Sequence, residues 1–225
     1  MTLAVTGATL DAQSVGLRAD GGRIVELGPD VGAQAGDEVV AGDGLALVPG
    51  LVNGHTHAAM TLFRGYGDDL PLMEWLEQRI WPAEGRLTAD DVYWGTRLAC
   101  VEMIRSGTVR FWDMYWQPGA TARAVDDAGL RATIGGPLID ALDSARAPAL
   151  RDDLRRHLDE LAGSGPRVSA GLAPHSIYAV SEPSLRWIGE QSRERELPVH
   201  IHLSETSDEV EQCVAAHGVR PRCLP

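Results

Sequence analysis

The sequence has 225 residues and is 44% hydrophobic, which is enough for one sizeable core or for a domain with a smaller appendage. Its formal net charge is −12, with acidic residues scattered through predicted helix faces, which argues against nucleic acid or an anionic membrane as a partner. No apolar run approaches the roughly 18 residues of a membrane span and no secretory signal pattern opens the chain, so we expect a soluble, cytoplasmic protein.

The first 49 residues are rich in Gly, Asp and Val and show no helical period. Two short alternating runs, SVGLRA and RIVELG, are joined through Asp20, Gly21 and Gly22, a combination that is typical of a β-hairpin. The segment DEVVAGDGLALVPG continues in the same manner. Residues 1–49 are therefore predicted to form a small, all-β piece.

From residue 50 onward the sequence predicts strands that alternate with helices. The expected strands are 51–57, 108–114, 130–135, 168–174 and 198–204. Five strand–helix units in series predict an α/β architecture with a parallel sheet, either a barrel, which would need about three more strands, or a doubly wound sheet. A dinucleotide-binding fold is disfavoured because no G-x-G-x-x-G motif follows the first strand.

The helices between these strands have recognisable ends. Thr88 and Asp91 have the spacing of a capping box, and Gly107 is suited to end that helix. The other helices are expected from near Thr121 to Gly129, along the leucine stripe of PALRDDLRRHLDELAG, from Ser181 onward, and from Thr206 to His217.

Two features of the composition limit the kind of site that the chain holds. Cys100, Cys213 and Cys223 lie far apart without a C-x-x-C spacing, which predicts neither a disulfide framework nor a structural zinc knot. All 20 basic residues are arginine, and the sequence contains no lysine.

Two H-x-H pairs, His55 with His57 and His200 with His202, lie at the ends of predicted strands. Side chains two residues apart on a strand share a face, and imidazole is a common zinc ligand. Histidines that only form hydrogen bonds within the core are the alternative, but two such pairs favour a metal site. His202 lies nearer the end of its strand, so we prefer it as the ligand, with His200 packed behind it.

Glu205 follows three residues after His202. Strict strand periodicity would place it on the opposite face, so a role at the site requires the strand to end or bulge there. A carboxylate near a metal-activated water would take its proton and pass it to a leaving group. The alternative is an exposed acid near the N-terminus of the next helix.

Three stretches carry more specific information: PGLVNGHTHAAMTLFRGYGDDLPLMEWLEQRIWPAE, APHSIYAVS and VHIHLSET. They resemble the amidohydrolase superfamily, and within it the branch of methylthioadenosine/S-adenosylhomocysteine deaminases and triazine chlorohydrolases. The resemblance implies a (β/α)8 barrel with a small β-sandwich built from both chain ends. Residues 1–49 would form the N-terminal part of the sandwich. Residues 50–225 would form the first five βα units, a partial TIM barrel.

The resemblance also implies roles for individual residues. His55 and His57 match the ligands on the first strand, His202 matches the ligand on the fifth strand, and Glu205 matches the acid that shuttles protons. One divalent metal is implied, with zinc preferred and iron as the alternative. Relatives with two metals bridge them with a carboxylated lysine, which this chain lacks, so a mononuclear site is expected.

Two further residues, Trp75 and His175, fall where the family contacts its substrate. Trp75 lies in LMEWLEQRIW, an amphipathic helix in which an aromatic side chain is also a natural core residue. His175 follows the end of a predicted strand, where barrel active sites assemble.

The function implied is hydrolytic deamination of a purine-like or other amino-substituted heterocycle by a metal-activated water. A chlorohydrolase acting on a halogenated triazine-like ring is the nearest alternative. Family members run to roughly twice this length and supply a further histidine and an aspartate ligand, so a truncated, non-catalytic fragment is another. The expected partner is a small heterocyclic substrate, and the chain is compatible with a homo-oligomer.

Overall fold

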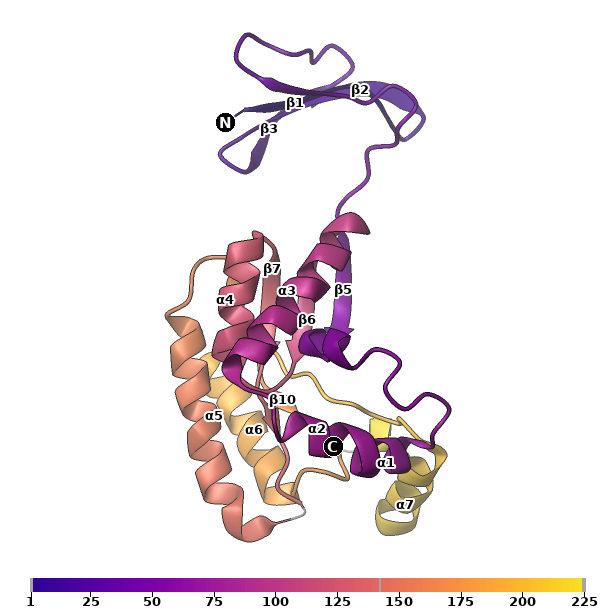
Figure 1. Cartoon of the computed structure of the whole chain (residues 1–225), viewed down its shortest axis with the longest axis vertical. Coiled ribbons are helices and arrows are strands. Elements are labelled where there is room, and N and C mark those ends of the chain that lie inside the picture. The colour runs from indigo at the N-terminus through magenta and orange to yellow at the C-terminus, as the bar shows by residue number, and fades with distance from the viewer. Residues whose placement is uncertain (1, 142, 224–225) are drawn as a thin grey trace. The chain divides into compact units, whose positions relative to one another are not determined.

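The computed structural model describes residues 2–141 and 143–223, without the side chains of Ser144 and Cys223. Met1, Leu142, Leu224 and Pro225 lie outside the described residues. The chain divides into two compact units, Met1–Gly50 and Leu51–Pro225 (Figure 1). None of the helices in the described part of the chain is long and apolar enough to cross a membrane.

The first unit contains one four-stranded sheet. Its strands are β1 (Leu3–Leu10), β2 (Gln13–Asp20), β3 (Arg23–Gly28) and β4 (Glu38–Ala41). They lie in the order β3-β2-β1-β4, with β4 parallel to β1 and the other pairs antiparallel. Gly21 and Gly22 both have positive φ, the backbone that a two-residue hairpin turn needs, so the predicted hairpin is confirmed.

The second unit is built on a parallel sheet of four strands. In spatial order these are β5 (Leu51–Thr56), β6 (Thr108–Met114), β7 (Arg131–Gly135) and β9 (Val168–Ala170). A second, two-stranded parallel pair joins β8 (Pro137–Leu138) to β10 (Ala173–Pro174). The predicted mixed α/β architecture with a parallel sheet is thereby confirmed.

Helices connect these strands and follow them. The longer ones are α3 (Ala89–Arg105), α4 (Pro118–Ala128), α5 (Ala147–Ala162), α6 (Glu182–Arg195) and α7 (Ser207–His217). Between β5 and α3 the chain forms a 3-10 turn (Ala58–Phe63), α1 (Leu72–Trp75), a π-helical turn (Leu76–Ile80) and α2 (Trp81–Glu84). Short 3-10 turns also occur at Ser144–Arg146 and Pro221–Cys223.

The predicted helix ends correspond to real caps. The Thr88 hydroxyl accepts the Asp91 N–H, and the Asp91 carboxylate accepts the Thr88 N–H at 2.8 Å, which is the predicted capping box. Gly107 follows α3 with φ +80°. Helix α4 begins at Pro118, three residues before the predicted start, because proline fixes a helical φ at the first position of a helix.

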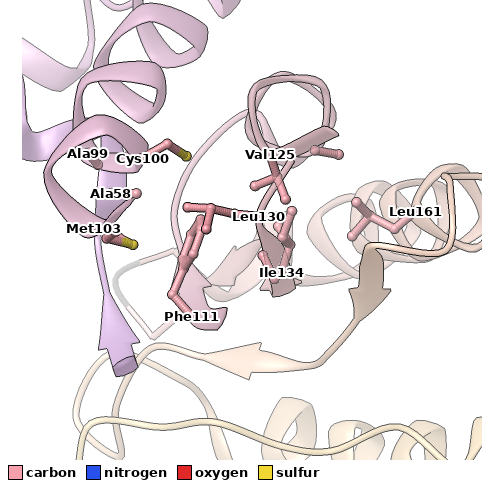
Figure 2. Close-up of a cluster of buried hydrophobic side chains, with 11 residues drawn as sticks. Ala58, Ala99, Cys100, Met103, Phe111, Val125, Leu130, Ile134 and Leu161 are labelled. Atoms are coloured by element: carbon pink, nitrogen blue, oxygen red, sulfur yellow. The ribbon is translucent and has the colours of Figure 1, made fainter. Parts of the chain in front are cut away.

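The core of this unit lies between the sheet and helices α3, α4 and α5 (Figure 2). Phe111 of β6 and Ile134 of β7 point into it from the sheet, and Cys100, Val125 and Leu161 meet them from the three helices. A second buried cluster joins α5 to α6 and includes Leu154, Leu158, Leu172, Trp187 and Ile188. These packed layers hold the carboxyl ends of the strands in place.

The predicted fifth strand, 198–204, is wrong as a regular strand. In the described structure this segment makes only single bridges, from Val199 to Leu172 and from His202 to Ser176. Its extended course ends at Ser204, whose φ is +60°. The predicted strand 168–174 is likewise broken into β9 and β10. At the break, Gly171 leaves room for the Trp112 ring, which would lie 1.8 Å from an added Cβ atom.

A close approach of backbones fixes the segment that follows β5. Gly95 of α3 lies against this segment, and an added Cβ would be 2.6 Å from the Ala59 oxygen and 3.0 Å from the Ala59 Cα. The Thr61 hydroxyl donates to the Gly95 carbonyl at 2.7 Å. Helix α3 therefore determines where the chain runs after His57.

We expect Gly95→Ala to lower the free energy of unfolding by about 1–3 kcal/mol, because backbone atoms cannot move aside for the new methyl group. Gly189→Ala in α6 is the matched control, since its nearest neighbour would be the Arg193 side chain at 3.6 Å. That substitution should raise the free energy of unfolding by about 0.5–1 kcal/mol. Urea unfolding of both variants tests this, and equal effects would contradict the close approach at Gly95.

Candidate metal centre

Three histidines converge at the carboxyl ends of the strands. His55 is the next-to-last residue of β5, and His57 follows that strand directly. His202 lies where the segment after β10 bridges to Ser176. One ring nitrogen of each histidine lies within 4.8 Å of those of the other two. The Nε2 atoms of His55 and His202 are 3.3 Å apart. This spacing brings the three imidazoles around one point.

Hydrogen bonds at Nδ1 orient two of these rings. His57 Nδ1 lies 2.6 Å from the Met114 carbonyl, and His202 Nδ1 lies 2.9 Å from the His175 carbonyl. A carbonyl oxygen only accepts hydrogen bonds, so each Nδ1 carries the proton and donates it. Each Nε2 then presents a lone pair, the form in which imidazole binds a metal.

The third ring is oriented by another histidine. His55 Nδ1 lies 3.0 Å from His200 Nε2. In the tautomer in which His55 Nδ1 donates to His200 Nε2, the Nε2 atom of His55 presents a lone pair, as the Nε2 atoms of His57 and His202 do. The Trp112 ring packs against His200 with centroids 4.8 Å apart. The structure thus places His202 in the cluster of three and His200 behind His55.

The electrostatics favour the neutral form of four imidazoles at and around the cluster, those of His55, His175, His200 and His202. Removal from water, followed by the charges of neighbouring histidines, lowers the pKa of His55 to about 4. The same causes lower the pKa of His175 to about 4 and also lower the pKa values of His200 and His202. Neutral imidazoles at pH 7 are ready to bind a metal without first losing a proton. Three ring nitrogens gathered within 4.8 Å of one another fit a divalent metal such as zinc.

A buried carboxylate fixes the turn that carries His57. Asp113, at the end of β6, is 0% exposed. Its Oδ1 atom accepts the Ala58 N–H at 2.7 Å and the Thr56 hydroxyl at 2.9 Å, so it holds the residues on both sides of His57. Oδ2 has no hydrogen-bond partner among the described residues. Burial raises the pKa of Asp113 to about 6.

Glu205 lies beside the same cluster, although strand periodicity would send it to the opposite face. The extended backbone ends at Ser204, and the chain turns before α7 begins. The Tyr178 hydroxyl donates to Glu205 Oε2 at 3.0 Å. Burial, and then the nearby charge of Glu205, raise the pKa of Tyr178 to about 12, so this hydroxyl remains a donor at neutral pH.

One cavity brings most of the expected site residues together. His57, His202 and Glu205 line it, and so do His175 and Trp75. The Trp75 indole N–H donates to the Tyr66 carbonyl at 3.0 Å, which fixes the ring in the cavity wall. Apolar and aromatic side chains complete the wall, among them Met60, Leu76, Trp81, Met114, Tyr115 and Trp116. Such a mixture is typical of a pocket for a flat organic ring.

Four polar residues around this cavity were not among those expected from the sequence. Glu84 lines the cavity and accepts the Trp116 indole N–H at 3.2 Å, and it is the last residue of the motif that ends in IWPAE. Asp113 ends a predicted strand, which is a detectable signal in an α/β fold. Tyr178 lies within the motif APHSIYAVS, and Glu209 stands three residues after Thr206, the spacing of a capping box.

The buried carboxylate gives a pH-dependent prediction. The folded-state pKa of Asp113, about 6, lies above its usual value of 3.8, so its protonated form favours folding and that stability is lost as the pH rises through 6. Asp113→Asn has no such titration. The free energy of unfolding of the wild type, measured in urea without metal, should therefore decrease relative to that of Asp113→Asn as the pH rises from about 4 to about 7. A difference that does not change with pH would contradict this.

Asp113→Ala separates the hydrogen bonds from the charge. It leaves the Ala58 N–H without its acceptor, whereas the Thr56 hydroxyl keeps the Trp112 carbonyl at 2.9 Å. We therefore expect it to be about 1–3 kcal/mol less stable than Asp113→Asn. Equal stability of the two variants would show that the carboxylate does not support the turn around His57.

The sequence matches known deaminases over most of its length. It is 52% identical over 189 residues to 5'-deoxyadenosine deaminase of Methanoregula boonei, covering 83% of this chain and 42% of that protein. It is 46% identical over 209 residues to 5-methylthioadenosine/S-adenosylhomocysteine deaminase of Desulforudis audaxviator, covering 90% of this chain and 48% of that protein. The chain thus spans about half the length of the curated relatives it matches.

The fold is also similar to a solved structure, an adenosine deaminase from Xanthomonas campestris with bound zinc. The TM-score is 0.78 at 33% sequence identity, and the match covers 98% of this chain and 53% of that one. Residues 46–223 match the amidohydrolase family. Because this match takes in both the sheet and the histidine cluster, the resemblance expected from the motifs is confirmed, and the chain belongs to the amidohydrolase family.

Proposed function

We propose that the protein is a metal-dependent deaminase that hydrolyses the amino group from a purine-like ring. The observation that carries this proposal is the convergence of one ring nitrogen from each of His55, His57 and His202, in a site where Glu205 lines the same cavity as His57 and His202. The names of the relatives, deaminases of adenosine derivatives, support the substrate class. The zinc in the similar adenosine deaminase supports zinc over iron.

We further propose that residues 50–225 form the first five βα units of a (β/α)8 barrel, and that residues 1–49 form part of a β-sandwich. The order β5-β6-β7-β9 follows the sequence, as expected for consecutive barrel strands. The bridge from Leu172 to Val199 adds a fifth parallel segment beside them. In this arrangement His55, His57 and His202 lie at the carboxyl ends of the strands, where barrel active sites assemble.

In the proposed mechanism the histidine cluster holds one divalent metal. When bound, such a metal lowers the pKa of a water molecule so that the water attacks at neutral pH. Glu205 takes a proton from this water as it adds to the ring carbon that bears the amino group. The C–N bond then breaks, and Glu205 returns the proton to the departing nitrogen, which leaves as ammonia. Tyr178 holds the carboxylate in place through its 3.0 Å hydrogen bond.

His175 and Trp75 are the proposed substrate contacts. His175 lies in the cavity next to His202, with ring centroids 4.6 Å apart, and its low pKa keeps it neutral. A neutral imidazole both donates and accepts hydrogen bonds, which suits a ring nitrogen or carbonyl of a purine. The half-buried Trp75 indole offers an apolar face against which a flat ring packs.

Glu205→Gln tests the mechanism. We expect it to lower kcat for ammonia release from 5'-deoxyadenosine by at least about 100-fold, because the amide cannot carry the proton, while the metal content stays unchanged. Glu211→Gln, an exposed acid on α7, is the matched control. Wild-type turnover in Glu205→Gln would contradict the proposed role of Glu205. If the wild-type protein released chloride from a chlorinated triazine and no ammonia from 5'-deoxyadenosine, the chlorohydrolase alternative would be favoured.

The ligand assignment is tested by zinc affinity, measured by competition with a chromophoric chelator. His57→Ala removes a proposed ligand and should abolish stoichiometric binding. His200→Ala removes only the partner of His55 Nδ1 and should weaken binding by about 10–100-fold. His217→Ala, exposed at the end of α7, should have no effect. Equal losses of zinc affinity in His57→Ala and His200→Ala would contradict the ligand assignment. A wild-type chain that does not bind zinc would favour the non-catalytic alternative.

A further inference from the structure

The position of Glu205 requires an explanation because the preceding backbone does not favour it. Residues three apart on a strand point to opposite faces, yet His202 and Glu205 line the same cavity. The chain achieves this by a sharp turn at Ser204, which has φ +60°. A residue other than glycine adopts this conformation only when its surroundings hold it there. Some group must therefore stabilise the turn.

Glu209 supplies that group. Its side chain is buried in the first turn of α7, and the residue is only 4% exposed. One carboxylate oxygen accepts the Ser204 N–H at 3.0 Å, and the other accepts the Glu205 N–H at 2.6 Å. Both oxygens of one carboxylate are thus used on two consecutive amides of the turn. Hydrogen bonds from N–H groups to an ionised carboxylate are stronger than those between neutral groups.

This arrangement differs from an ordinary helix cap. The Thr206 hydroxyl accepts the Glu209 N–H at 3.1 Å, as an N-cap residue does. In a capping box the glutamate side chain would return to the N–H of Thr206 itself. Here the Glu209 carboxylate reaches past Thr206 to the two preceding residues. The helix start is already capped by Thr206, so the contacts of Glu209 serve the turn in front of it.

We propose that Glu209 is a positioning residue that holds Glu205 beside the metal site by accepting the N–H groups of Ser204 and Glu205. The inference rests on the proposed role of Glu205 as the proton carrier. Glu209 fixes the backbone of Glu205, and Tyr178 fixes its carboxylate from the neighbouring segment. Helix α7 thereby acts as a rigid support for the reacting carboxylate, while the histidine cluster is held independently by its own hydrogen bonds.

Hydrogen exchange tests the contact without any assay of activity. In Glu209→Gln one carboxylate oxygen becomes an NH2 group, which cannot accept, so at least one of the Ser204 and Glu205 amides loses its acceptor and should exchange at least 10-fold faster. Amides in the rest of α7 should keep their protection. Glu211→Gln, an exposed acid on the same helix, is the matched control and should change neither group. Unchanged protection at Ser204 and Glu205 in Glu209→Gln would overturn the inference.

Kinetics test the consequence. Glu209→Gln should lower kcat at least 10-fold while KM for 5'-deoxyadenosine and zinc content stay near wild type. Adding Ser204→Gly should recover part of the lost kcat, because glycine adopts positive φ without strain. A loss of stability in α7 alone would not be rescued in this way. Wild-type kcat in Glu209→Gln, or no recovery on adding Ser204→Gly, would overturn the inference.

The two proposals fail in different ways. If Glu205→Gln is inactive but Glu209→Gln turns over at the wild-type rate, the mechanism stands and the positioning role of Glu209 is wrong. If Glu205→Gln turns over at the wild-type rate, the proposed role of Glu205 is wrong, and the role of Glu209 is overturned with it.

Discussion

The candidate site depends above all on hydrogen bonds at the outer nitrogens of its histidines. The backbone carbonyls of Met114 and His175 each lie within hydrogen-bond distance of an Nδ1 atom. A carbonyl oxygen only accepts hydrogen bonds, so each of these Nδ1 atoms must carry the proton. This leaves the Nε2 atoms of His57 and His202 as lone-pair donors aimed at one point, and His55 joins them through its bond to His200. Were these rings free to turn, three histidines close in space would not make a metal site.

Two buried carboxylates extend the same principle from the rings to the backbone. Asp113 accepts hydrogen bonds from the residues on either side of His57, and Glu209 accepts the amides of Ser204 and Glu205. Each carboxylate sits on a rigid element, the end of β6 or the first turn of α7, and ties an irregular segment to it. The fold therefore supplies rigid supports, and the candidate site residues His57 and Glu205 lie on short irregular segments that these carboxylates hold.

Much of this was predictable from the sequence because it depends on local pattern. The hairpin at Gly21 and Gly22, the capping box at Thr88 and the pairing of His55 with His57 follow from spacing and turn chemistry. The irregular end of the predicted fifth strand did not follow, because it depends on a positive φ at Ser204 and on a carboxylate contact that only tertiary structure brings together. Glu84 ends the motif IWPAE, but its place in the cavity could not be predicted, because only the folding of distant segments brings α2 to the same cavity as His57 and His202.

We propose that three imidazoles of this chain bind one metal through Nε2. X-ray absorption spectroscopy of the zinc-loaded chain is the measurement to make, because the first coordination shell reports the number and type of donors. We expect three imidazole nitrogens at about 2.0–2.1 Å, with the outer-shell scattering of intact imidazole rings. A shell with fewer than two imidazoles, or one that contains sulfur, would contradict it.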